Sequence, residues 1–429
     1  MENIDKNIVQ STVAPATPVP QPVAWIGLDW GHKTHAFAVQ ERGQAPEEGT
    51  LEHSAESLHA WLRGLEKRWG GRPVALGLET SRGAVIHVLL QYAWLTLYPI
   101  NPMTSARYRT AFTPSGASDD VPDARVLLEL VRDHAAKLRP LQVQDDVTVQ
   151  LAGLVEVRRD LVDRRTQVLN QLTSLLRTYY PQALELVGAL DSELALDFLE
   201  RWPDLLRLKA AQPAAVKRFY HAHHLRRPEL LEERLAFIKS AVALTTQDAR
   251  VSVAVLHLRC LLDQVRAFQK HLALLAAEIK TVFAAHPQAA LFRDLPGAGP
   301  ALAPRLCVAF GTLPELYPDP ASLQKAAGLA PVREKSGQSL WTHWRWRAPA
   351  FLRQSFIEWS GQTVVHSIWA RAYYQHRKAK GQEHHVILRA LAFKWVRVLW
   401  KCWQSGVAYD EARYLQQLAR RKSPYAVPS

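Results

Sequence analysis

The pattern of apolar and polar positions divides the chain into three regions, and the first region has a mixed character. Between residues 24 and 134, short apolar runs alternate with amphipathic stretches, as in domains built from both strands and helices. We predict strands at 24–29, 35–41, 49–53, 74–79 and 95–100, and helices at 54–69 and 83–92. Strands first, followed by strand–helix alternation, predict an α/β domain.

The second region, residues 145–290, is rich in Leu, Ala, Arg and Gln and is predicted to be helical almost throughout. Residues 147–180 form one long amphipathic stretch, and residues 230–285 form a second one that is interrupted around Thr245. Residues 184–224, between them, are less regular. Two long helices with apolar stripes predict either an antiparallel coiled coil or a dimerisation arm.

The third region begins with a turn, Leu295–Pro300, that leads into an apolar helix at 301–310. The Pro-Gly-x-Gly pattern is typical of a helix-hairpin-helix motif, whose backbone amides suit a phosphate, but a plain turn between helices fits the spacing equally well. Further predictions are a helix at 322–327, a polar loop at 332–339 and helices over most of 351–402.

The predicted fold class is therefore α/β plus all-α. The expected segments are a disordered Pro-rich tail at 1–22, a catalytic α/β domain at 23–144, a helical insert at 145–290, a helical C-terminal domain at 291–405 and a basic tail at 406–429. A chain of 429 residues has ample length for several cores of this kind.

Four acidic residues of the first region indicate a metal site. Asp29 and Glu79 each close an apolar run, so their carboxylates should lie at the rim of a sheet. Asp120 and Asp123 are three apart, on one face of a helical turn, and Asp119 is the competitor of Asp120 in that pairing. Converging carboxylates repel one another unless cations lie between them, and Mg²⁺ prefers oxygen ligands. The pattern favours metal-assisted phosphoryl transfer in a ribonuclease-H-like domain, although each acid alone fits a strand end or a helix cap.

The charge of the chain indicates its class of binding partner, and its cysteine content indicates the cellular compartment. A net charge of +13 and a pI near 9.7 favour nucleic acid as the partner, over a merely basic protein. The cysteines Cys260, Cys307 and Cys402 are far apart and form no CxxC pair, which fits a reducing cytoplasm. No run approaches the ~20 apolar residues that a bilayer requires, and the N-terminus lacks the features of a signal peptide, so we expect no membrane partner.

Five segments, in order, resemble the DEDD transposases of insertion sequences, whose relatives include the Piv-type DNA invertases. The segments are WIGLDWG (25–31), LGLETS (76–81), DDVPDA (119–124), LPGAGPALAPRL (295–306) and KAAGLAPVREKSG (325–337). Residues 158–181 are similar to the helix that starts the coiled-coil region of that family. The resemblance spans about residues 24 to 405, which is nearly the whole chain.

The resemblance implies a RuvC-like N-terminal domain, a coiled-coil insert and a C-terminal domain that carries a serine. The four acids of the family fall on Asp29, Glu79, Asp120 and Asp123, which would bind Mg²⁺. The nucleophilic serine falls on Ser336, with Ser339 as the alternative. The implied activity is DNA recombination on element ends and target DNA by a homo-oligomer, a dimer or a tetramer. A structured noncoding guide RNA and a place in the bacterial nucleoid follow from the same resemblance.

Clusters of cations are candidate nucleic-acid contacts. They are Arg158, Arg159, Arg164, Arg165 and Arg177 in the predicted arm, Arg345 and Arg347 in an aromatic-basic segment, and Arg377 and Lys378 further on. Guanidinium matches phosphate in bidentate fashion, but Asp160 and Asp163 could neutralise half of the arm's arginines within the helix. Residues 340–349, LWTHWRWRAP, depart from the Gly/Lys/Arg-rich stretch of relatives, and their tryptophans fit either base stacking or a core.

Two functions from other classes are consistent with the same residues. One is a RuvC-like, metal-dependent nuclease that hydrolyses structured DNA with water and leaves Ser336 as an ordinary turn residue. The other is a nucleic-acid-binding protein without catalytic activity.

Overall fold

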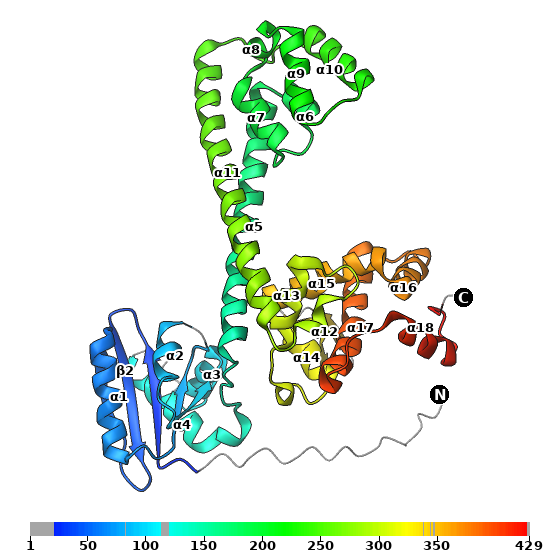
Figure 1. The fold of residues 1–429 in the computed structure, drawn as a ribbon. Helices are drawn as coiled ribbons and strands as arrows, with labels where there is room; N and C mark the ends of the chain where they lie inside the picture. Colours follow the sequence, from blue (N-terminus) through cyan, green and yellow to red (C-terminus); the bar gives the residue numbers. More distant parts are fainter. Residues whose placement is uncertain are drawn as a thin grey trace. The chain divides into compact units, whose positions relative to one another are not determined.

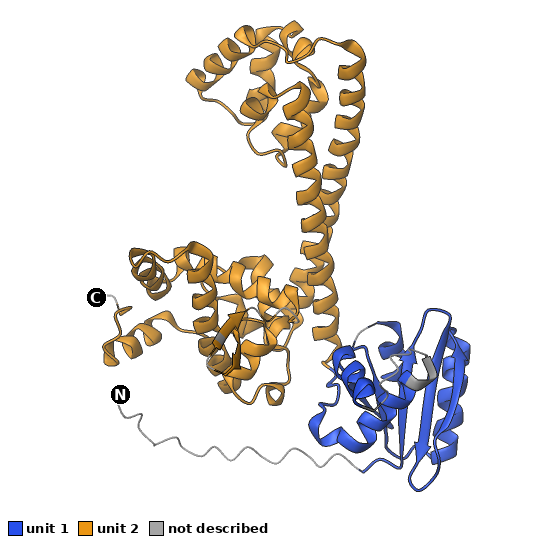
Figure 2. Ribbon diagram, turned by 180° about the vertical axis from the view of Figure 1, so that it is seen from behind, with its two compact units in different colours: residues 1–143 blue, residues 144–429 orange. Residues whose placement is uncertain are grey.

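The computed structural model describes residues 21–81, 83–112, 120–337, 339–343, 345 and 348–426, and the chain divides into two compact units. The first unit comprises residues 1–143 and the second comprises residues 144–429 (Figure 2). In the described part of the chain, no helix combines the length and the apolar character needed to span a membrane. The mixed α/β first unit and the helical remainder confirm the predicted fold class at this level.

A five-stranded sheet forms the centre of the first unit. Its strands are β1 (Ala24–Trp30), β2 (Thr34–Glu41), β3 (Glu47–Glu52), β4 (Val74–Leu78) and β5 (Leu95–Pro99). The strand order is β3-β2-β1-β4-β5; β2 runs antiparallel to β1 and β3, whereas β4 runs parallel to β1 and β5. Each of the five predicted strands is therefore confirmed, with ends that shift by only a few residues.

Helices cover both faces of this sheet (Figure 1). They are α1 (Ala55–Trp69), α2 (Ala84–Leu89), α3 (Pro102–Phe112) and α4 (Asp120–His134), followed by the 3₁₀ turn η1 (Ala135–Lys137). Local sequence explains α1 well: the Ser54 hydroxyl accepts a hydrogen bond from the Ser57 amide, and left-handed Gly70 ends the helix. The segment around Arg107 and Arg109, predicted only as a basic stretch, is the helix α3.

Two glycines allow α4 to lie directly against the sheet. A Cβ added at Gly27 of β1 would come within 1.8 Å of the Ala124 carbonyl oxygen, and one at Gly77 of β4 within 2.8 Å of the Leu127 carbonyl oxygen. Side chains at these two positions would push the helix away. The glycines thus fix how closely α4, which carries two of the candidate acids, approaches β1 and β4.

We expect Gly27→Ala to lower the stability of the first unit by about 3 kcal/mol, because the backbone of α4 cannot accommodate the methyl group. Gly64→Ala is the matched control: Gly64 lies inside α1, and a Cβ there meets nothing within 4 Å. This second change should stabilise the unit by roughly 0.5–1 kcal/mol, since alanine favours helix. Calorimetric unfolding of the full-length chain measures both. Equal melting temperatures for Gly27→Ala and the unsubstituted chain would contradict the close approach.

Two long antiparallel helices form an arm in the second unit. They are α5 (Asp146–Tyr179) and α11 (Asp248–Ala285), and they lie side by side in both views (Figure 1 and Figure 2). Leu151 near the start of α5 shares a cluster with Phe283 near the end of α11, whereas Leu172 further along α5 clusters with Leu262. The predicted antiparallel pair of long helices is confirmed.

Short helices cap one end of the arm. They are α6 (Gln182–Val187), α7 (Glu193–Arg201), α8 (Leu205–Ala210), α9 (Pro213–Ala222) and α10 (Pro228–Ser240). Residues 241–247 separate α10 from α11, which confirms the interruption predicted around Thr245. The region predicted to be less regular consists of these short helices, joined by turns.

The C-terminal part of the second unit is a helical bundle. Its elements are α12 (Ala289–Arg293), α13 (Gly299–Phe310), the 3₁₀ turn η2 (Pro314–Leu316), α14 (Pro320–Ala326), α15 (Ala350–His366), α16 (Ile368–Ala379), α17 (His384–Ser405) and α18 (Glu411–Arg420). In its core, the Trp395 ring contacts both Trp359 and Trp369 in tilted arrangements, and all three side chains are buried. The turn between α12 and α13 packs on α15, because the Trp359 indole donates to the Pro296 carbonyl at 3.0 Å. A Cβ at Gly297 would meet Gln362.

One prediction for this part was wrong. The predicted polar loop at 332–339 is a β-hairpin made by β6 (Val332–Ser336) and β7 (Ser339–His343). The described side chains of β6 are mostly exposed, so the sequence carries no alternation of apolar and polar positions to reveal a strand.

Candidate functional site

Asp29 and Glu79 lie at equivalent positions, at the carboxyl ends of two neighbouring strands of the same sheet. In the parallel register, Leu28 of β1 pairs with Leu78 of β4, so the next residue on each strand is an acid at the carboxyl end of the sheet. Neighbouring strands lie about 4.8 Å apart, which makes the two backbones adjacent. Asp29 is two residues after Gly27 and therefore shares its face, the one on which α4 packs.

Asp123 lies in the first turn of α4, next to Ala124, the residue in contact with Gly27. Ala124 also clusters with Ala36 of β2, which pairs with Asp29 across the sheet. The structure thus brings the segments that carry Asp29, Glu79 and Asp123 to one face and one end of the sheet. The side chain of Asp120, and Asp119 as a whole, lie outside the described residues.

Helix α3 supplies a donor to each of two acids. The Ser105 hydroxyl donates a hydrogen bond to the Glu79 carboxylate, and the Arg109 guanidinium forms an ion pair with Asp123. Ser105 is buried, and both partners in the Arg109–Asp123 pair are partly buried. Neither contact was predicted. The available signal was the spacing of four residues between Ser105 and Arg109, which places them on one helix face.

The donors present suit a hard divalent cation, because carboxylate oxygens are the ligands that Mg²⁺ takes. Among the side chains that the structure describes, no three His, Cys, Asp or Glu lie close enough together to hold a metal ion. Arg109 provides the positive charge at Asp123 in this arrangement. A bound metal ion would compete with this guanidinium for the same carboxylate.

Ser336 is the last residue of β6 and is exposed. Gly337 follows it with a φ of 59°, a left-handed conformation that suits the tight turn of a hairpin. Ser339 pairs with Ser336 across the hairpin, so the two candidate serines face each other at its tip. Trp341 on β7 is exposed, whereas Trp344, Trp346 and Arg347 lie outside the described residues.

Three of the five arginines predicted as arm contacts already have carboxylate partners. Arg164 pairs with Asp160 at 2.8 Å, Arg165 lies 3.7 Å from Asp191, and Arg159 binds Asp163 and Glu358. Arg158 differs: burial lowers its pKa, and the neighbouring Arg305, Arg165 and Arg159 lower the pKa further. Arg177 is exposed.

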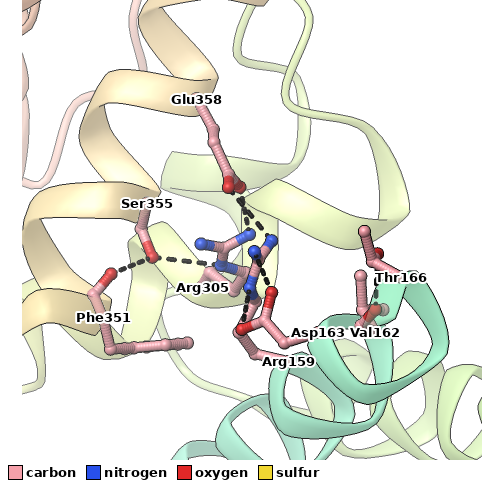
Figure 3. Close-up of polar contacts among 8 residues, drawn as sticks. All are labelled: Arg159, Val162, Asp163, Thr166, Arg305, Phe351, Ser355 and Glu358. Atoms are coloured by element: carbon pink, nitrogen blue, oxygen red, sulfur yellow. Dashed lines mark hydrogen bonds and ion pairs between the residues drawn. The ribbon is translucent and has the colours of Figure 1, made fainter. Parts of the chain in front are cut away.

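Arg159 belongs to an ion-pair cluster that fixes the arm to the C-terminal bundle (Figure 3). Arg305 of α13 is buried and donates to Glu358 at 2.7 Å and to Ser355 at 3.0 Å. Its guanidinium also lies 5.2 Å from the centre of the Phe351 ring. Arg159 of α5 donates to the other oxygen of Glu358 at 3.0 Å. Glu358 therefore joins three helices, and sequence analysis did not predict its role.

Two segments of the chain match models of known transposase families. Residues 26–181 match the family model of the DEDD transposases of the IS110 type, and residues 289–375 match that of the transposase IS116/IS110/IS902 family. The first match contains Asp29, Glu79, Asp120 and Asp123, and the second contains Ser336.

Individual relatives cover nearly the whole chain. The transposase assigned to the IS117 mini-circle of Streptomyces coelicolor is 27% identical over 399 residues, which are 90% of this chain and 95% of that protein. The 43.6 kDa protein of insertion element IS110 from the same species is 25% identical, over 90% of this chain and 95% of its own length. The 42 kDa protein of IS900 from Mycobacterium paratuberculosis is 25% identical, over 91% and 98%.

An α/β domain with acids at its strand ends, followed by a helical region with the second family segment, defines a DEDD-type transposase, an enzyme that recombines DNA. The chain belongs to the IS110/IS116/IS902 family of insertion-sequence transposases. The DEDD designation suggests a divalent metal for this class.

Proposed function

We propose that this transposase cuts and rejoins DNA with an acidic Mg²⁺ site, formed by Asp29, Glu79, Asp120 and Asp123, and with Ser336 as the nucleophile. The observation that carries the proposal is the parallel register of β1 and β4, since it makes the backbones of Asp29 and Glu79 neighbours on the sheet. The strand order, with β2 and β3 antiparallel beyond a parallel β1-β4-β5, supports a RuvC-like domain.

The residues of the first unit prepare the acidic site for a phosphate. Mg²⁺ bound by the four carboxylates supplies electrophilic activation of the phosphodiester and neutralises charge on its oxygens. Ser105 donates to Glu79 and so orients that carboxylate, as outer partners of metal ligands do. Arg109 neutralises the charge of Asp123 through their ion pair, and its guanidinium can also bind a DNA phosphate.

Ser336 supplies the covalent step. Its hydroxyl attacks the phosphorus of the scissile phosphodiester: a bond forms between Oγ and phosphorus, and the bond from phosphorus to the deoxyribose oxygen breaks. The hydroxyl proton passes to a general base, which returns it to the departing oxygen. The free hydroxyl of another strand then attacks the phosphoserine and releases Ser336, so the number of phosphodiester bonds is conserved.

A structured noncoding RNA is the proposed guide for pairing with element ends and target DNA. Support from this chain is its basic character and the environment of Arg158, where burial and the nearby Arg305, Arg165 and Arg159 lower the pKa of the guanidinium. The cytoplasm of a bacterium, close to the nucleoid, is the proposed site of action.

A homo-oligomer, a dimer or a tetramer, is proposed to hold the DNA ends together. The arm supports this assignment, because large apolar side chains are exposed along both of its helices. They are Val149 and Val157 of α5 and Val253, Leu256 and Leu274 of α11.

The test is reconstitution with the full-length chain, DNA that carries the element ends and a target, Mg²⁺ and the transcript that flanks the gene. We expect joined strands that depend on both the RNA and the metal ion. Hydrolysed ends without joined products would show a RuvC-like nuclease instead. Binding without cutting under every metal and RNA condition would show a binding protein and overturn the proposal.

A further inference from the structure

The apolar stripe of α5 is interrupted partway along the arm, at residues 156–167, which we call the waist. Val155 belongs to the core of the C-terminal bundle, whereas Val168 belongs to the core around the cap of the arm. No residue of α5 between these two valines is buried. Helical spacing places Arg158, three residues after Val155, and Arg165, three residues before Val168, on the stripe. Two arginines thus stand where the rest of the stripe is mostly apolar.

Arg305 of α13 brings a buried guanidinium to the waist. Its side chain is only 5% exposed, and it donates through Nε to Ser355 and through Nη1 to Glu358 (Figure 3). Its third nitrogen, Nη2, is buried and has no acceptor in the described part of the chain, and the same holds for Nε of Arg165. Buried donors of this kind are unfavourable unless a ligand or water accepts from them.

Arg158 is the neighbour that connects these two donors. It is half-buried, and its pKa is lowered first by burial and then by the positive charges of Arg305, Arg165 and Arg159. Because the interaction between charges weakens with distance, the guanidinium of Arg158 must lie close to those of Arg305 and Arg165. The two buried donors and an additional cation therefore occupy one place on the arm.

The carboxylates at the waist do not neutralise all of these cations. Four arginines share three carboxylates: Arg158, Arg159, Arg165 and Arg305 with Asp163, Asp191 and Glu358. Arg159 and Arg305 take up both oxygens of Glu358, and Asp191 lies 3.7 Å from Arg165, beyond hydrogen-bond distance. Glu156 lies two residues before Arg158 and so faces another side of α5. One positive charge remains at the waist.

We propose that Arg158, Arg165 and Arg305 form a binding site for a phosphate group at the waist of the arm. Phosphate oxygens accept hydrogen bonds from several guanidinium groups at once, and the negative charge offsets the repulsion among the cations. A nucleic-acid backbone is the source of phosphate that the net charge of +13 favours, and this choice of source rests on the proposed function. A phosphate bound here joins α5 to α13, so nucleic-acid binding would strengthen the attachment of the arm to the bundle.

Thermal unfolding of the full-length chain, in phosphate and in chloride of equal ionic strength, tests the site. At about ten times its dissociation constant, phosphate should raise the melting temperature of the unsubstituted chain by roughly 2–4 °C. Arg158→Gln should lose this rise. Arg207→Gln is the matched control and should keep it, because Arg207 is an exposed arginine of the arm cap that pairs with Asp204 at 3.3 Å. Since phosphate also stabilises proteins by exclusion from their surface, the difference between the two variants is the measure.

The melting temperature in chloride gives a second readout. Arg158→Gln should melt at or above the temperature of the unsubstituted chain, because it removes a charge whose neighbours have the same sign. An arginine with a purely structural role would instead lower the melting temperature when it is removed. An unchanged rise with phosphate in Arg158→Gln, or a clear fall of its melting temperature in chloride, would overturn the proposal.

Fluorescence anisotropy with a labelled RNA hairpin and with a DNA duplex identifies the source of the phosphate. For Arg158→Gln/Arg165→Gln, the slope of log affinity against log salt should fall by roughly 0.7–0.9, because one backbone phosphate loses its contact. Affinity should fall about tenfold, whereas Arg207→Gln should stay within about twofold. A loss with only one of the two nucleic acids assigns the site to that one. Unchanged slopes with both, together with the rise in phosphate, support the site and assign it to free phosphate.

The result is separable from the serine chemistry. Ser336→Ala keeps the arginines of the waist and should show the full rise of melting temperature in phosphate. If Ser336 proved unnecessary for recombination, the proposed function would fail, whereas the loss of the phosphate effect in Arg158→Gln would still support the site.

Discussion

Replacing Asp29 by Asn is expected to reduce strand cutting and joining by about a hundred- to a thousandfold, and Glu79→Gln should have an effect of similar size. Each change removes one negative oxygen from the acidic site while it keeps the size of the side chain. The loss of charge weakens metal binding and removes stabilisation of the charge that develops on the phosphate. The measurement is the rate of product formation on element-end DNA at saturating Mg²⁺, with the RNA present.

Glu52→Gln is the matched control for this prediction. Glu52 is an exposed acid that ends β3, and its register with Thr34 places it at the same end of the sheet, two strands from Asp29. It should retain near-normal rates, and all three variants should melt within a few degrees of the unsubstituted chain. A normal rate in Asp29→Asn, or an equal loss in Glu52→Gln, would remove the acidic site from the mechanism.

Ser336→Ala should abolish joined products, with a loss on the order of 10⁴-fold or more, since a nucleophile cannot be replaced by its neighbours. The change removes one exposed oxygen and leaves the hairpin ladder of β6 and β7 intact. Rates of joining and the amount of covalent protein–DNA complex, measured on denaturing gels, test this expectation.

Ser339→Ala provides the internal control, because Ser339 pairs with Ser336 in the hairpin and is also exposed. It should recombine DNA at a rate within a few-fold of normal. The reverse pattern, with Ser339 essential and Ser336 dispensable, would reassign the nucleophile. Normal activity in both variants would favour hydrolysis by water.

The first unit could be predicted closely because its strands are short apolar runs bounded by polar turns. Ala24, Ile26 and Leu28 of β1 are buried, and so is each residue of β4, so burial and sequence pattern agree. The hairpin at β6 and β7 escaped prediction because its sequence, Val-Arg-Glu-Lys-Ser, faces solvent and carries no period of two. Helix α3 escaped prediction because its polar and basic sequence carries no clear apolar stripe.

The residues of the candidate site also divide into those that the sequence could predict and those that it could not. The apolar runs predicted that Asp29 and Glu79 lie at strand ends, and helical spacing and the family resemblance added Asp123, which lies in the first turn of α4. The partners Ser105 and Arg109 depend on how α3 packs, which no local pattern contains. In the arm, Arg159 and Arg164 were predicted as phosphate contacts. The structure instead pairs them with carboxylates from the same helix and, for Arg159, also from α15.

Mass spectrometry of the trapped covalent complex tests the central claim most directly. Trypsin should release residues 336–345, which contain both candidate serines, and fragmentation can locate the attached nucleotide. The account predicts a phosphodiester link at Ser336 that forms only with Mg²⁺ and disappears in Asp29→Asn. A nucleotide attached to any other residue, or complete strand joining with no protein-linked DNA at any time, would contradict it.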